Sequence, residues 1–182
     1  MKQIHSFGEG SMLDEKREEA LELAEKLDMP ESIRTPGRTW TRYRDLDIDV
    51  EDVRNIAPKI KIEGDAEVFT GEEAVEEAGE TMLDALKIDE NRINALHAAY
   101  MNSLVYIKAS DSDIRIVYEQ EKPIFAHVVV ETGESAEVSL TEEFRGNPGV
   151  LTSFNEFYLG DNSSMTYGAV ESAGGFSYSA RK

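Results

Sequence analysis

The sequence predicts an α+β chain in which a helical and irregular N-terminal region, residues 1–101, precedes a β-rich region, residues 102–182. Two stretches before residue 102 carry apolar side chains at the three-to-four-residue spacing of an amphipathic helix. Seven short apolar and β-branched runs follow, separated by polar turns and by no helical stretch. Such strands fit a sandwich, a barrel or a β-solenoid, and periodicity does not choose among the three.

The first predicted helix spans about 11–28. Ser11 followed by Asp14 resembles a capping box, and apolar residues then recur at helical spacing. Pro30 lies beyond the helix end, where proline cannot continue the hydrogen-bonded ladder. We expect irregular structure from there to about Lys61.

A second helical region is predicted from Gly71 to Met101, with two helices, the second capped by Asp89. In the β-rich region, a solenoid would stack its strands in parallel register, and its uncovered last layer would show apolar side chains. We therefore expect the chain to associate with itself or with a partner. The predicted strands are 104–108, 114–119, 124–131, 136–141, 150–159, 164–171 and 176–180.

Composition narrows the function classes. The chain has no cysteine, which removes disulfides, thiolate nucleophiles and cysteine-ligated metal sites held by this chain alone. With 37 acidic and 19 basic residues, the net charge of -18 repels nucleic acids and anionic membranes. No apolar region follows the first residues and nowhere do 18 apolar residues run together, so we expect a cytoplasmic protein.

Motif searches predict a protein that is not an enzyme. The sequence has no phosphate-binding loop and no His-Glu-x-x-His pair. Asp45, Asp47 and Asp49 alternate like the start of a calcium loop, but Val50 and Ile56 replace its glycine and glutamate. A small hydrolase that uses scattered carboxylates stays an alternative. We predict no catalytic and no cofactor-binding residue.

Two histidines fall on predicted elements. His97 lies on a helix, where we expect a packing or capping role. His127 lies in the middle of a strand. If buried it needs a hydrogen-bond partner, and if exposed on a partner-facing surface it is the candidate metal ligand.

Four aromatic residues are candidate anchors for packing or for a partner. Trp40 and Tyr43 form an aromatic pair with basic neighbours in an acidic chain. Phe176 and Tyr178 lie in the last predicted strand, at the end of the expected stack.

Three parts of the chain, within about 20–178, resemble the SufB/SufD family of iron-sulfur cluster assembly proteins. A Leu-Asp-Met-Pro segment at 27–30 precedes Trp-Thr-Arg-Tyr-Arg-Asp-Leu at 40–46, an order similar to the family's N-terminal signature. Segments 128–138 and 154–167 resemble two of the family's consecutive β-helix coils.

The resemblance implies a helical N-terminal region followed by a right-handed parallel β-helix, of which this chain holds about the first half. The C-terminal helices that dock the SufC-type ABC ATPase in this family have no counterpart before Lys182. The family's cluster-building residues lie largely in the missing half, so no site residue is carried over. The lack of cysteine makes the chain more similar to SufD than to SufB.

On this resemblance we expect a scaffold component of the SUF system that acts with a SufC-type ATPase and a SufB-like partner. The iron-sulfur cluster would then belong to the complex, and this chain alone would bind no cofactor. The alternative is a stand-alone β-solenoid that binds other proteins and has no role in cluster assembly.

Overall fold

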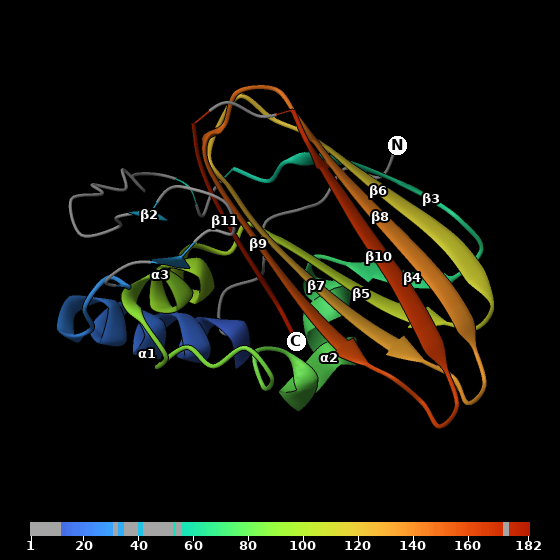
Figure 1. Cartoon of the computed structure of the whole chain (residues 1–182). Coiled ribbons are helices and arrows are strands. Elements are labelled where there is room, and N and C mark those ends of the chain that lie inside the picture. The colour runs from blue at the N-terminus through green and yellow to red at the C-terminus, as the bar shows by residue number, and fades with distance from the viewer. Residues whose placement is uncertain (1–11, 31–32, 35–39, 42–52, 54–55, 173–174) are drawn as a thin grey trace.

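Helices and strands occupy separate layers in a computed structural model that describes residues 12–30, 33–34, 40–41, 53, 56–172 and 175–182. Two β-sheets face each other, and the helices lie against the outer face of one of them (Figure 1). This is the α+β class with an N-terminal helix that the sequence predicts.

Helix α1, Met12–Lys26, is the first predicted helix. Asp14 lies in its first turn, where a negative charge favours the helix dipole. The helix packs against α3, Arg92–Tyr100. The Arg17 guanidinium donates to the Met101 carbonyl across 2.5 Å, which ties α1 to the end of α3.

The second helical region contains α2, Glu72–Ala78, the short 3-10 helix η2, Gly79–Thr81, and α3. The predicted cap of α3 by Asp89 is wrong. The Asn91 side chain accepts the Asn94 amide N–H at 3.0 Å, because Asn91 is the extended residue directly before the first turn. No helix within the described residues is long and apolar enough to cross a bilayer.

All seven predicted strands are present, with bounds close to those expected. Their side chains alternate between two faces, as the sequence pattern indicates. The strands are β5 Ser103–Ala109, β6 Ser112–Glu119, β7 Ile124–Thr132, β8 Glu137–Arg145, β9 Gly149–Tyr158, β10 Ser164–Glu171 and β11 Gly175–Arg181.

Two further strands, β3 and β4, precede these seven and were not predicted. β3, Lys59–Glu63, pairs antiparallel with β6, and β4, Glu67–Thr70, pairs antiparallel with β5. The alternation Lys-Ile-Lys-Ile in β3 is a strand pattern, but it is short and lies where we expected irregular structure. The two-residue strands β1, Ile33–Arg34, and β2, Trp40–Thr41, form a separate antiparallel pair.

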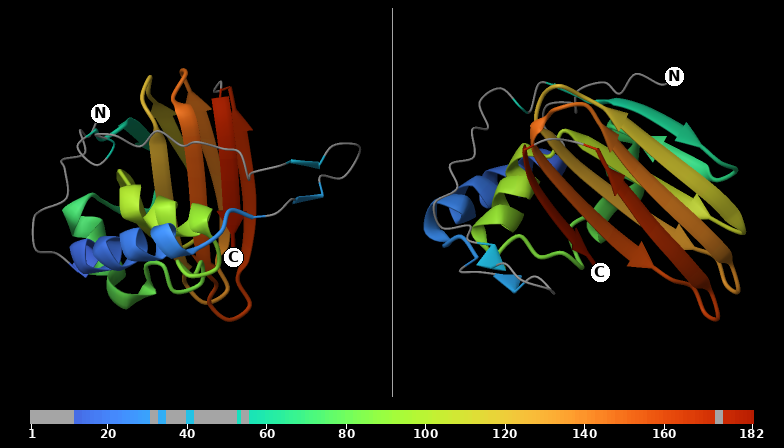
Figure 2. Two further views of the ribbon diagram at one scale, coloured as in Figure 1. Left: turned by 90° about the vertical axis from the view of Figure 1, so that its left-hand side faces the viewer. Right: turned by 45° about the horizontal axis from the view of Figure 1, so that its top comes forward.

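Successive strands from β5 to β11 alternate between the two sheets, whose orders are β10-β8-β6-β3 and β11-β9-β7-β5-β4. Every pair among these seven strands is parallel, the register expected of a stack. Figure 2 shows the strands of each sheet side by side, with the helices to one side.

Turns of successive layers lie directly on one another. The Gly160 amide donates to the Thr132 hydroxyl at 3.0 Å, and the Ser135 amide donates to the Asp161 carbonyl at 2.7 Å. A Cβ atom on Gly160 would lie 2.6 Å from the Gly133 carbonyl oxygen, so this approach requires glycine.

Two apolar layers hold the sheets and helices together. Along β5, Val105 and Ile107 belong to the layer between the sheets, whereas Leu104 and Tyr106 belong to the layer between the five-stranded sheet and the helices. The five-stranded sheet is therefore covered on both faces, and polar side chains in the middle of its strands β7 and β9 are buried.

Candidate functional site

A buried row of four polar side chains lies between α3 and the five-stranded sheet: Thr152, His97, His127 and Glu156. We call it the histidine relay. The two histidines and Glu156 are 0% exposed and Thr152 is 1% exposed. Buried polar groups cost free energy unless they are hydrogen-bonded, so the partners of each atom decide what the row can do.

The relay is continuous from one end to the other. His97 Nδ1 lies 2.8 Å from Thr152 Oγ1, and His97 Nε2 lies 3.2 Å from His127 Nδ1. His127 Nε2 lies 3.1 Å from Glu156 Oε2. All four ring nitrogens thus have a partner at hydrogen-bond distance.

Strand register and one helix bring the relay together. His127 on β7 pairs with Phe154 on β9, and Thr152 and Glu156 flank Phe154 at alternate positions on the same face. From α3, the His97 ring stacks on the Phe154 ring, with 3.8 Å between centroids and 5° between planes. This stacking fixes the orientation of the His97 nitrogens.

Glu156 also binds the chain segment that follows η2. Its carboxylate accepts the Leu83 amide at 2.8 Å and the Leu86 amide at 2.6 Å. Leu83 has φ 64°, a left-handed conformation that is uncommon outside glycine. The Tyr158 hydroxyl donates to the Thr81 carbonyl at 2.9 Å. The relay therefore joins α3, residues 81–86 and the sheet.

Burial and hydrogen bonding set the charges of the relay. Burial lowers the pKa of His97 well below its ordinary value, and the neighbouring His127 lowers it further. Burial raises the pKa of Glu156, but the hydrogen bond and charge of His127 and the two amides outweigh it, so this pKa lies below the usual value. At neutral pH, His97 is neutral and Glu156 is a carboxylate.

The structure places His127, the metal candidate from the sequence, at the centre of the relay with both ring nitrogens in contact with other side chains. Its burial and partners match the first of the two alternatives that the sequence left open. In the part of the chain that the structure describes, no three His, Asp or Glu side chains are arranged to hold a metal ion. A metal role for His127 stays a prediction.

Sequence reasoning missed Thr152 and Glu156. The one local signal was their position in β9, a strand that is buried in its middle although it also carries Ser153 and Asn155. Polar residues in a buried strand require hydrogen-bond partners, so they indicate a polar site, but the sequence does not show which residues the partners are.

A second buried polar group surrounds Glu142, between the two sheets. The Tyr167 hydroxyl donates to Glu142 Oε2 at 2.6 Å, and Ser153 lies 3.4 Å from the same oxygen. Glu142 Oε1 has no hydrogen-bond partner among the described residues. Burial raises the pKa of Glu142 and so favours its protonated form, although the hydrogen bond from Tyr167 acts in the opposite direction.

The inner face of β11 is polar, whereas Met165 and Tyr167 of β10 pack against the apolar layer between the sheets. Arg181 donates to the Tyr167 hydroxyl at 3.3 Å and lies 4.6 Å from that ring's centroid. Glu171 accepts from Ser177 at 2.8 Å and from Ser179 at 3.3 Å. The polar residues of β11 face inward because they alternate with its aromatic residues.

Among the four anchor candidates, the structure describes the side chains of Phe176 and Tyr178. Phe176 and Tyr178 lie on the other face of β11, where both are half-buried, and the Tyr178 ring lies 6.0 Å from the Phe154 ring. Trp40 lies in β2, but its side chain and all of Tyr43 fall outside the described residues. Anchor roles for these residues stay predictions.

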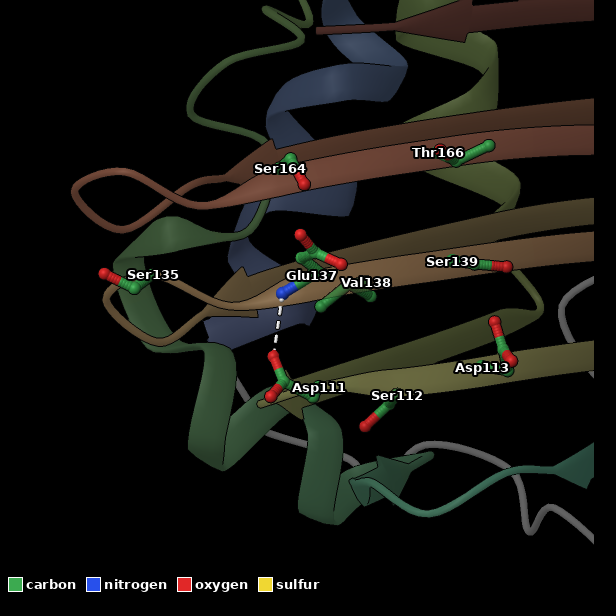
Figure 3. A pocket seen from close by; sticks show the side chains of 9 residues that line it. All are labelled: Asp111, Ser112, Asp113, Ser135, Glu137, Val138, Ser139, Ser164 and Thr166. Atoms are coloured by element: carbon green, nitrogen blue, oxygen red, sulfur yellow. Dashed lines mark hydrogen bonds between the residues drawn. The ribbon is translucent and has the colours of Figure 1, made fainter.

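A wide groove of about 700 Å³ lies on the four-stranded sheet (Figure 3). Asp111, Asp113 and Glu137 line it together with serine and threonine hydroxyls. One Asp111 oxygen accepts the Glu137 amide at 2.9 Å, which fixes the turn before β8. The groove is an acidic, hydroxyl-lined surface without a histidine or a basic residue among its lining side chains.

Comparison with known proteins gives a partial relationship. No protein-family model and no solved structure matches the chain. The chain is 32% identical to the iron-sulfur cluster assembly protein SufD of Bacillus subtilis (strain 168) over 102 residues, covering 50% of this chain and 23% of SufD. The match thus spans about a quarter of that relative, and the chain is in part similar to the SufB/SufD family.

Proposed function

We propose that this chain is a SufD-like scaffold component of an iron-sulfur cluster assembly system. The similarity to SufD over half of the chain carries this proposal. The parallel stack of β5 to β11 supports it, because an extended stack offers long edges and faces to other proteins.

In this proposal the seven strands are the first coils of a right-handed parallel β-helix that is incomplete relative to the family. Three features support a coil. Strands alternate between the sheets, their pairs are parallel, and the turns at Gly133 and Gly160 contact each other. A Cβ on Gly175 would likewise lie 2.2 Å from the Gly149 carbonyl, at the opposite end of the strands.

The chemistry in this proposal belongs to a cytoplasmic complex with a SufC-type ATPase and a SufB-like protein. The chain is not an enzyme and holds no cluster alone, since it has neither a phosphate loop nor a cysteine. The partner would cover the edge formed by β10 and β11, where Val170 is 53% exposed.

Affinity capture of a SufB-like protein and a SufC-type ATPase by the tagged chain tests the proposal. We expect a stable complex that Val170→Asp weakens, whereas Met12→Asp on α1, which also changes an exposed apolar side chain, leaves it intact. Failure to bind either protein across the micromolar range would overturn the scaffold role. Specific capture of an unrelated protein instead would favour the stand-alone binding module.

Anaerobic reconstitution tests the cofactor part separately. We expect no protein-bound visible chromophore on the chain alone and no ATP hydrolysis by it, because thiolates and a phosphate loop are lacking. A stoichiometric chromophore on the isolated chain would contradict this part of the proposal while leaving the complex open to test.

A further inference from the structure

We propose that the histidine relay is a proton-sensitive lock: it holds α3 and residues 81–86 on the five-stranded sheet while it carries at most one added proton, and a second proton releases them in acid. The lock is independent of the proposed role in cluster assembly. It rests on the three contacts that link Thr152, His97, His127 and Glu156 in one line.

The neutral relay has a single arrangement of protons that satisfies every contact. The Glu156 carboxylate only accepts, so His127 Nε2 carries a proton and donates to it. His127 Nδ1 is then an acceptor, and His97 Nε2 donates to it. The remaining nitrogen, His97 Nδ1, accepts from the Thr152 hydroxyl.

One added proton fits without the loss of a contact. It binds His97 Nδ1, while the proton on His97 Nε2 passes to His127 Nδ1. His127 becomes an imidazolium beside the Glu156 carboxylate, and His97 stays neutral with its proton on Nδ1, where it donates to Thr152 Oγ1. The relay gains one proton, and each of its three contacts keeps one donor and one acceptor.

A second proton has no favourable position. On His97 it sets two N–H groups against each other across 3.2 Å, in a site with no exposure to water. On Glu156 it weakens the acceptor of the Leu83 and Leu86 amides. Either change disrupts the interface between the helices and the sheet.

The relay's own members dominate its electrostatics. Burial and His127 lower the pKa of His97, and the shift of Glu156 arises from burial, His127 and two backbone amides. The Glu156 charge in turn raises the pKa of Tyr158, after burial, to about 12. Other titratable groups on the elements packed around the relay include Lys16 and Arg17 of α1, Asp84, Glu131 of β7 and Tyr178 of β11.

Nitrogen-15 NMR of the imidazole rings over a descending pH series tests the proton arrangement. We expect both rings to carry the proton on Nε2 at neutral pH, and His97 to move its proton to Nδ1 in the same transition that turns His127 into an imidazolium. A native spectrum in which His97 becomes an imidazolium, or in which His127 titrates while His97 keeps its tautomer, would overturn the proposal.

Hydrogen exchange tests the release. Protection factors of the Leu83 and Leu86 amides should fall at least tenfold in acid before those of the central strand β7. His97→Gln, which cannot take up a proton, should shift this fall to the lower pH at which Glu156 is protonated, whereas His5→Gln, a change at the third histidine, should leave it unchanged. Protection that falls together with that of β7 in the wild-type chain, or that falls at the same pH in the His97 variant as in the wild-type chain, would contradict the lock.

Discussion

The ring of His97 lies flat on the ring of Phe154, with 3.8 Å between the centroids and 5° between the planes. This contact joins the third helix to the centre of the five-stranded sheet. It also places the two nitrogens of His97 between Thr152 and His127. An apolar contact therefore fixes the geometry of a polar site.

We expect Phe154→Ala to destabilise the chain by about 3–5 kcal/mol, the usual effect of deleting a large buried side chain. Phe154 is 0% exposed, so the lost ring leaves a cavity beside His97. Urea denaturation at neutral pH measures the difference. Phe154→Leu, which refills most of the volume but cannot stack, should lose clearly less, and equal losses would argue against the cavity as the main contribution.

Glu156→Gln should lower the free energy of unfolding by about 1.5–3 kcal/mol at neutral pH, because hydrogen bonds to a charged group are replaced by weaker ones. The amides of Leu83 and Leu86 and the His127 ring all depend on this acceptor. Chemical denaturation measures it. Asp111→Asn, at an acid that accepts one backbone amide in the groove, is a control and should change stability far less.

Stability should fall with decreasing pH in two stages. The pKa of His97 is lowered in the folded state, so the unfolded chain binds the proton first and stability declines as the pH drops below about 6.5. The pKa of Glu156 is also lowered, so its contribution is present above about 4.3 and is lost as the pH falls through the folded value. Melting temperature against pH measures both stages, and a flat profile between pH 7 and 5 would contradict the first.

Gly160→Ala should destabilise the stacked turns, since its Cβ would lie 2.6 Å from the Gly133 carbonyl oxygen. Relief requires one turn to move away from the other and breaks hydrogen bonds between layers. Gly168→Ala on β10 is the matched control, because a Cβ there meets no atom within 4 Å. Similar melting temperatures for both variants would refute close stacking of the turns.

Glu142→Gln should be neutral or stabilising at neutral pH. Burial raises the pKa of Glu142 in the folded chain, so the ionised form opposes folding once the pH rises above the unfolded value. Tyr167→Phe, which removes the 2.6 Å donor to Glu142, should instead destabilise by about 1–3 kcal/mol. Chemical denaturation at pH 7 measures the free energy of unfolding of both variants, and a Glu142→Gln variant that loses as much as Tyr167→Phe would contradict the prediction.

The sequence alone determined the helices and the seven strands, because their signals are local. Apolar spacing along 11–28 predicted α1, and turns with glycine, asparagine or aspartate separated runs that became β5 to β11. The short strands β3 and β4 were missed, since four or five residues with weak alternation resemble an irregular segment. The cap of α3 was misplaced by two residues for a different reason: several polar side chains precede that helix, and each of them could serve as a cap.

Only the tertiary structure decided which strands pair and which polar residues meet. His97 and His127 are 30 positions apart, and His127 and Glu156 are 29 apart, so no local pattern joins them. Their contact depends on the parallel register of β7 and β9, which is a property of two distant segments packed together. The alternation of side chains along a strand indicates which face of the sheet each one lies on, and the packing of distant segments decides which residues it contacts there.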